Sequence, residues 1–198
     1  MIHLKYGNTN TFLVQGTKDN ILVDTDWAGT MPQFYREIKR HQIKIDDIAY
    51  VMATHYHPDH MGLIGELMGR GIKLLLLDVQ KPFVHYSDAI FARNKRLEYL
   101  PICEENAIHI SCYESRSFLR SLGIGGEMIS TPSHSEDSIS LLLDDGDCIV
   151  GDLEPVGNLE GYGENEMLRR DWEKIMKHQP KIIYFGHCNA MKIDQGSK

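Results

Sequence analysis

Four side chains that can bind a metal ion fall within six residues of this 198-residue sequence: His55, His57, Asp59 and His60. They directly follow an apolar run, Ile48 to Ala53, that is typical of a buried strand. Buried imidazoles and carboxylates are costly unless paired, so core packing does not explain the cluster. His55 and His57, two apart in an extended loop, can point to one side, and Asp59 and His60 can face a neighbouring ion. Imidazole and carboxylate together favour zinc, iron or manganese over calcium or magnesium.

Three more candidate ligands each follow an apolar strand-like run: His134, Asp152 and His187. A polar residue that follows a buried strand, beside Gly or Pro, lies at the edge of the sheet. Several such residues at the same edge can form a site. Taken singly, each residue has a simpler explanation as a hydrogen-bonded strand end or a turn residue. Taken together with the first cluster, they predict one metal centre.

At this point the sequence resembles the metallo-β-lactamase-fold hydrolase superfamily, which includes the glyoxalase II thioesterases. The HxHxDH motif of that family is matched by residues 55–60, and its three later ligands match His134, Asp152 and His187 in order. The resemblance extends from Asn10 through Gly186-His187. One departure is Ser133, where the family usually has glycine; serine suffices if the backbone there needs no positive φ.

The resemblance implies a fold and a ligand set. The fold is a four-layer αββα sandwich of mixed α/β class, with the site at one edge of the sheets. His55, His57 and His134 are implied to hold one ion, Asp59, His60 and His187 a second, and Asp152 to bridge both. The cofactors are then two Zn²⁺ ions, with iron or manganese as alternatives.

The implied activity is hydrolysis of a small ester, thioester or lactone, because two divalent ions make a bridging hydroxide available at neutral pH. Asp59 has a second expected role as a catalytic residue that orients the water and takes its proton. A phosphodiesterase acting on a small phosphodiester, and a redox or non-catalytic metal-binding member, are the alternatives. No Ser-His-Asp or Cys-His nucleophile is expected, and strand alternation predicts that Cys188 is a buried thiol directed away from the metals.

Strand-rich stretches with interspersed helices imply sheets covered by helices. We expect helices over residues 31–42, 63–68, 79–100 and 164–178, and strands over 10–15, 20–24, 48–53, 73–77, 127–131, 138–143, 147–150 and 181–185. The stretch from Val79 to Arg120, with aromatic Phe83, Tyr86 and Phe91, is either a specificity element or a helix that packs into the core. Tyr162 is a candidate substrate-facing donor. A glutathione thioester is a less favoured substrate, because the chain is short of the C-terminal helical region of glyoxalase II.

Composition limits the partners. The chain has 21 basic and 28 acidic residues, a formal charge of −7, which disfavours nucleic acid. No apolar run is long enough to span a bilayer, and the N-terminus lacks a signal-peptide pattern, so no membrane partner and a cytoplasmic location are expected. The four cysteines have no paired spacing and are expected to be reduced, buried thiols. The length predicts a single domain, 1–198, acting on a small molecule, with a homo-oligomer left open.

Overall fold

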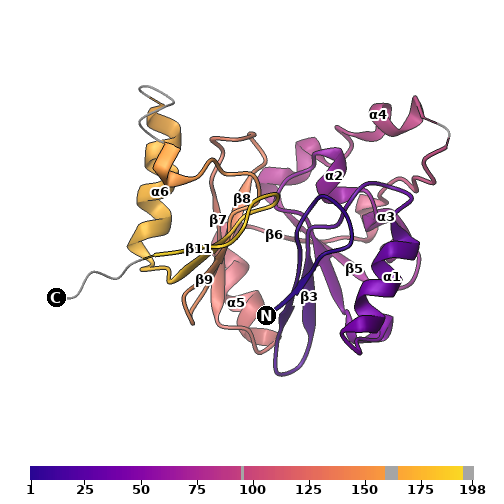
Figure 1. Cartoon of the computed structure of the whole chain (residues 1–198), viewed down its shortest axis with the longest axis horizontal. Helices are drawn as coiled ribbons and strands as arrows, with labels where there is room; N and C mark the ends of the chain where they lie inside the picture. The colour runs from indigo at the N-terminus through magenta and orange to yellow at the C-terminus, as the bar shows by residue number, and fades with distance from the viewer. Residues whose placement is uncertain (95, 159–164, 194–198) are drawn as a thin grey trace.

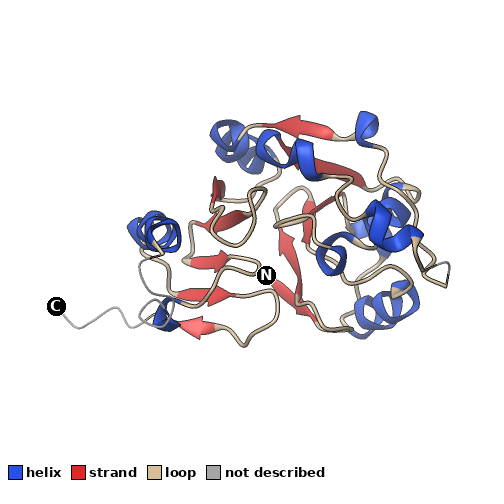
Figure 2. Cartoon of the chain, turned by 90° about the horizontal axis from the view of Figure 1, so that it is seen from above, coloured by secondary structure: helices blue, strands red, loops and turns tan. Residues whose placement is uncertain are grey.

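Two β-sheets pack face to face in a computed structural model that describes residues 1–94, 96–158 and 165–193. Within these residues the first sheet has six strands in the order β1 to β6, and the second has five in the order β11-β10-β9-β8-β7. Helices cover the outer face of each sheet, and one further helix lies between the two sheets (Figures 1 and 2). The expected αββα sandwich is therefore confirmed.

The first sheet and its helices come from the amino-terminal part of the chain. Its strands are β1 (Ile2–Leu4), β2 (Thr11–Gln15), β3 (Asn20–Val23), β4 (Tyr50–Met52), β5 (Lys73–Leu77) and β6 (Ile108–Ile110). The helices between them are α1 (Met31–Arg40), α2 (Pro58–Met61), α3 (Ile64–Met68) and α4 (Asp88–Ala92). Short 3₁₀ turns cover Ile45–Asp47 (η1), Asp78–Phe83 (η2) and Glu104–Asn106 (η3).

The second sheet follows helix α5 (Cys112–Ser121), which packs on β7. Leu119 of this helix and Leu122, which caps its C-terminus, lie in the core between the sheets. Its strands are β7 (Gly126–Ser130), β8 (Ile139–Leu143), β9 (Asp147–Ile149), β10 (Ile182–Tyr184) and β11 (Met191–Lys192). A 3₁₀ turn (η4, Val156–Asn158) and helix α6 (Glu166–Lys177) lie between β9 and β10. Helix α6 covers the outer face of this sheet (Figure 1).

Strands β5 and β8 carry apolar side chains at consecutive positions, and these side chains point alternately to the two faces of their sheet. Both faces of each sheet are therefore buried. In β5, Leu75 and Leu77 face the second sheet, whereas Leu74 and Leu76 face the helices of the first layer. In β8, Leu141 faces the first sheet and Leu142 faces α6. Because side chains alternate with a period of two, a strand that is apolar at every position is suited to the interior of such a sandwich.

The sequence expectations hold for most elements, with one clear error. Residues 79–100 do not form the expected helix: the chain makes the 3₁₀ turn η2, and of the residues described in this range only Asp88–Ala92 is α-helical. Pro82 removes a backbone donor within this stretch, which favours short turns over a continuous helix. The following segment supplies β6, which pairs with β5, so the stretch to Arg120 contributes to the sheet itself.

No helix in the described ranges combines the length and the apolar character needed to cross a lipid bilayer.

Candidate metal centre

The loop after β4 presents two histidines in extended backbone. His57 has φ −69° and ψ 152°, the conformation favoured before a proline, and Pro58 then begins the short helix α2. The backbone N–H of His60 donates to the carbonyl of His57 at 3.0 Å, which turns the chain so that Asp59 and His60 follow on α2. The motif therefore places His55 and His57 in an extended loop and Asp59 and His60 on a helix.

All seven candidate side chains meet where β4, β7, β9 and β10 end. Their nitrogen and oxygen atoms form three groups whose members lie within 4.8 Å of one another: His55, His57 and His134; His55, His60 and Asp152; and Asp59, His60 and His187. Strands β3 and β4 are parallel, as are β9 and β10, so their carboxyl ends share one edge of each sheet. In Figure 1 this edge is marked by α2, at the upper end of the sheets.

The first group has the spacing of a small cation site. Nε2 of His55 lies 3.0 Å from Nδ1 of His57, and Nε2 of His134 lies 3.2 Å from the same Nδ1. Two nitrogens that each lie about 2.1 Å from a tetrahedral zinc ion are roughly 3.4 Å apart. The imidazole nitrogens thus lie at about the separation of two ligands of one ion, and slightly closer.

Asp152 lies at the centre of the cluster. Its Oδ1 is 3.3 Å from Nε2 of His60, and its Oδ2 is 3.3 Å from Nε2 of His187 and 3.8 Å from Nε2 of His134. The carboxylate therefore contacts histidines of both outer groups. This is the position that a bridging ligand requires.

Glycine is needed beside this carboxylate. A Cβ built on Gly186 would collide with Oδ1 of Asp152 and would lie 2.7 Å from Cε1 of His60. The absence of a side chain at residue 186 lets the strand end approach the cluster closely. Its backbone accepts from the N–H of Asn10 at 2.7 Å, which ties the two sheets together beside the site.

Three of the histidines are oriented by oxygens on the side away from the cluster. Nδ1 of His60 lies 3.0 Å from Oδ2 of Asp24, Nδ1 of His187 lies 3.2 Å from the carbonyl of Asn8, and Nδ1 of His55 lies 3.2 Å from Oγ1 of Thr54. An oxygen partner on one ring nitrogen fixes the tautomer that leaves the other nitrogen free to coordinate. In each case the free nitrogen is Nε2, which points into the cluster.

Burial and neighbouring charges shift the pKa values of the ligand side chains in different directions. Burial, together with the surrounding histidines, lowers the pKa of His55 well below its usual range, and burial also lowers the pKa of His134. Burial alone would lower the pKa of His60, but the charges of Asp24 and Asp152 outweigh it and raise the value to about 10. Burial raises the pKa of Asp152, but the neighbouring histidines outweigh this and hold it below its usual range.

These observations test whether the residues fit metal ions. Oδ1 of Asp152 is buried without a hydrogen-bond partner among the described residues, and several imidazole nitrogens face one another at about hydrogen-bond distance. Facing acceptors of this kind are unfavourable unless protons or cations lie between them. Imidazole with carboxylate is also the donor set of zinc and of other transition metals. The residues fit a pair of divalent cations.

Two residues that support the site were not singled out from the sequence. Asp24, at φ 59°, is fully buried and accepts from the N–H and the hydroxyl of Thr54 as well as contacting His60. It obeys the same strand-end rule as Asp152, since it directly follows β3, so a signal for it existed. Asp137 accepts from the N–H of Tyr56 at 2.6 Å and from Oγ of Ser135 at 2.7 Å. It therefore joins the loop of His55 and His57 to the loop of His134.

The expectation for the cysteines was wrong in part. All four are free thiols, but Cys148 alone is buried, Cys112 is partly buried, and Cys103 and Cys188 are exposed. Cys188 follows the end of β10 instead of lying within it, so strand alternation does not apply to its side chain. Ser133 is accommodated as expected, because its φ is not positive. Its N–H donates to Asp171 at 2.9 Å.

Comparison with known proteins decides the family. The description of the matching family is "Metallo-beta-lactamase superfamily", and the match covers residues 4–187. This chain belongs to the metallo-beta-lactamase superfamily. The HxHxDH segment, His134, Asp152 and His187 all lie within the matched range of this superfamily member.

Two curated relatives are similar to this superfamily member at low identity. The "Beta-lactamase-like protein 2 homolog" of Drosophila melanogaster is 25% identical over 93% of the chain and 60% of the relative. The "Atrochrysone carboxyl ACP thioesterase" of Aspergillus terreus is 21% identical over 72% of the chain and 39% of the relative. The chain thus spans less than two thirds of the length of either relative.

Solved structures show the same fold. The "BLEG-1 B3 metallo-beta-lactamase" superimposes with a TM-score of 0.70 and 19% identity, covering 98% of this chain and 94% of that one. The protein TTHA1623, solved "in a di-iron-bound form", gives a TM-score of 0.69 and 18% identity, with 96% and 93% covered. At these identities the likeness establishes the architecture of the superfamily member and not its substrate.

Proposed function

We propose that this superfamily member is a hydrolase that binds two divalent metal ions, zinc by preference, and cleaves a small ester, thioester or lactone. The observation that carries the proposal is the convergence of five histidines and two aspartates, from four separate strand ends, into interlocking groups of ligand atoms. A thioesterase among the relatives supports the reaction class, and a di-iron form among the structural neighbours supports a pair of ions.

The proposed ligand sets follow the three groups of atoms. His55, His57 and His134 would hold one ion and Asp59, His60 and His187 the other, with Asp152 shared between them. Bound ions of this kind lower the pKa of water to about 7 and stabilise the negative charge that develops on a carbonyl oxygen during attack.

The chain itself contributes orientation and proton transfer. Oδ2 of Asp59 lies 3.2 Å from Nε2 of His187, and its side chain is 23% exposed, so it faces both the cluster and solvent. We assign Asp59 the role of orienting the attacking water and accepting its proton. Asp24 and Asn8 hold the rings of His60 and His187 in the orientation that this requires.

Purified protein, with its metal content measured, should be assayed against p-nitrophenyl acetate, an acyl thioester, a lactone and bis(p-nitrophenyl) phosphate. We expect turnover of one or more of the carboxylic substrates that depends on bound metal and falls by at least about 100-fold in Asp59→Asn. Turnover of the phosphodiester alone would replace the proposal with a phosphodiesterase. Absence of turnover in a fully metal-loaded protein would favour a redox or non-catalytic role.

A further inference from the structure

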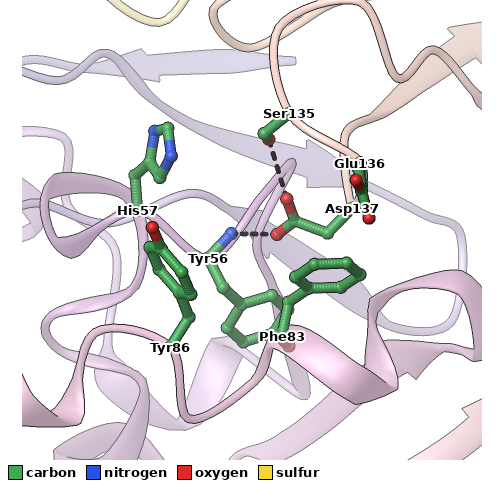
Figure 3. A pocket seen from close by; sticks show the side chains of 7 residues that line it. All are labelled: Tyr56, His57, Phe83, Tyr86, Ser135, Glu136 and Asp137. Atoms are coloured by element: carbon green, nitrogen blue, oxygen red, sulfur yellow. Dashed lines mark hydrogen bonds between the residues drawn. The ribbon is translucent and has the colours of Figure 1, made fainter.

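A pocket of about 250 Å³ opens directly beside His57. Figure 3 shows His57 and Tyr86 on one side of it and Asp137 on the other, with Tyr56 and Phe83 at its base. The lining residues come from the metal-ligand loop, the η2–α4 segment and the loop after His134: Tyr56, His57, Phe83, Tyr86, Ser135, Glu136 and Asp137. A substrate group next to the metal centre would enter this space.

Aromatic side chains form one wall of the pocket. Tyr86 is 65% exposed, and its ring lies 6.5 Å from the ring of His57. The backbone that carries Tyr86 is fixed, because its N–H donates to Phe83 at 2.8 Å and the buried hydroxyl of Ser87 donates to the carbonyl of Tyr56 at 2.6 Å. A large ring held open to solvent beside a candidate active site is suited to contact with a ligand.

The opposite wall is acidic. Both oxygens of Asp137 are engaged by Tyr56 and Ser135, as described above. Glu136 is exposed and makes no hydrogen bond or ion pair with any described residue. Its charge is therefore available to act on whatever occupies the pocket.

A second pocket, of about 180 Å³, flanks the other side of the metal centre and is also acidic. Its lining includes Asp152, Glu154 and Asn165. Across the part of the chain that the structure describes, neither pocket is lined by lysine or arginine. A substrate carboxylate or phosphate would find no cation there other than the metal ions and would face Glu136 across the first pocket.

We propose that the pocket of Tyr86 and Glu136 selects substrates by charge: it binds an uncharged or cationic aromatic or alkyl group and rejects an anionic one. This inference rests on the proposed hydrolase function, because it concerns the group attached to the bond that is cleaved. The aromatic wall supplies apolar contact, and cation–π contact for a cationic group. Glu136 supplies attraction for a cation and repulsion for an anion.

The test uses the metal-loaded 198-residue chain and three thioesters of phenylacetic acid that differ only in the para substituent: methyl, trimethylammonium or carboxylate. We expect kcat/KM for the methyl compound to exceed that for the carboxylate by about tenfold or more, and the trimethylammonium compound to equal or exceed the methyl compound. Glu136→Lys should reverse the order of the two charged compounds. Tyr86→Ala should raise KM for the methyl compound, whereas Tyr113→Ala, which truncates a tyrosine on α5 that is 95% exposed, should not.

Binding of the matching amides, which are not hydrolysed, is measured in parallel by ligand-observed NMR. If the amides bind with the expected charge order and respond to Tyr86→Ala while no thioester is cleaved, the pocket is confirmed and the hydrolase proposal fails. If the carboxylate compound binds and reacts as well as the methyl compound, the charge selection is overturned while hydrolysis stands. Unchanged selectivity in Glu136→Lys also overturns it.

Discussion

Oδ2 of Asp24 lies 3.0 Å from Nδ1 of His60, and both side chains are fully buried. The same carboxylate accepts from the backbone and the hydroxyl of Thr54, the residue before His55. The carbonyl of His60 in turn accepts from the N–H of Thr25 at 2.9 Å. One residue at the end of β3 therefore orients a candidate ligand of the second ion and the loop that holds the ligands of the first.

Replacing Asp24 by asparagine keeps the shape of the side chain but removes its charge. We expect metal affinity to fall by about 10- to 100-fold, because the partner that orients a histidine ligand also raises its basicity. Titration of metal-free protein with zinc measures the change. Asp46→Asn, at an exposed position in η1, is the control and should bind as the parent does. Equal affinity in Asp24→Asn would show that this carboxylate does not support the site.

Asp137 is expected to act as a positioning residue for two loops. In Asp137→Asn, one acceptor oxygen is replaced by an amide donor and the negative charge is lost, so the N–H of Tyr56 loses a charged acceptor and the hydrogen bond with Ser135 must reverse or break. The free energy of unfolding should fall by about 1–3 kcal/mol, and the affinity of the His55, His57 and His134 group for zinc should fall with it. Chemical denaturation and zinc titration measure the two effects.

The control for Asp137→Asn is Glu105→Gln, which changes an exposed carboxylate outside the site. A variant Asp137→Asn with normal stability and normal zinc affinity would contradict the role assigned to this residue.

Gly186→Ala tests the close approach of the β10 end to the cluster. The new methyl group would collide with Asp152 and crowd His60, so we expect a loss of about 1–3 kcal/mol of stability and weaker metal binding. Gly157→Ala is a matched control, because a Cβ there meets no atom of the described residues within 4 Å. Its stability should stay within about 0.5 kcal/mol of the parent value. Similar behaviour of the two variants would argue against steric limits at residue 186.

Glu37 predicts a dependence of stability on pH. Its carboxylate accepts from the guanidinium of Arg40 at 2.7 Å and from the N–H of Lys5 at 3.1 Å. The hydrogen bonds from Arg40 hold the pKa of Glu37 below its usual value of 4.5. Because the folded-state pKa is depressed, the stabilisation is fully present above pH 4.5 and is lost as the pH falls through the folded-state value.

The variant Glu37→Gln should therefore be less stable than the parent by about 1 kcal/mol at pH 7. The difference should shrink below pH 4.5, as the parent protein becomes protonated. Denaturant unfolding at pH 7 and in acid measures it. A difference that persists unchanged in acid would assign the effect to packing and not to charge.

Sequence patterns predicted those helices and strands whose apolar residues recur regularly along the chain. β5 is apolar at four consecutive positions, and α1 and α6 have apolar residues at helical spacing. The strand ends that carry His134, Asp152 and His187 were predicted from the same patterns. Their convergence follows from topology, because parallel strands bring their carboxyl ends to one edge.

The region from residue 79 to 120 was predicted poorly for identifiable reasons. Phe83 and Tyr86 line the pocket, while Phe91 is buried against Trp27 and Tyr99, so this stretch both lines the pocket and packs into the core. β6 has three residues and depends on pairing with β5, a long-range contact. Helix α5 had a readable signal, the capping box of Ser111 and Glu114.

Tyr162, the candidate substrate-facing donor, lies outside the described residues. The role of Tyr162 as a substrate-facing donor stays a prediction of the sequence.

The most direct test of the whole account is an anomalous difference map from crystals of this protein grown with zinc. Two peaks are predicted: one among His55, His57 and His134, the other among Asp59, His60 and His187, each next to Asp152. A map with no peak within this cluster would contradict the claim that these side chains form a two-metal centre.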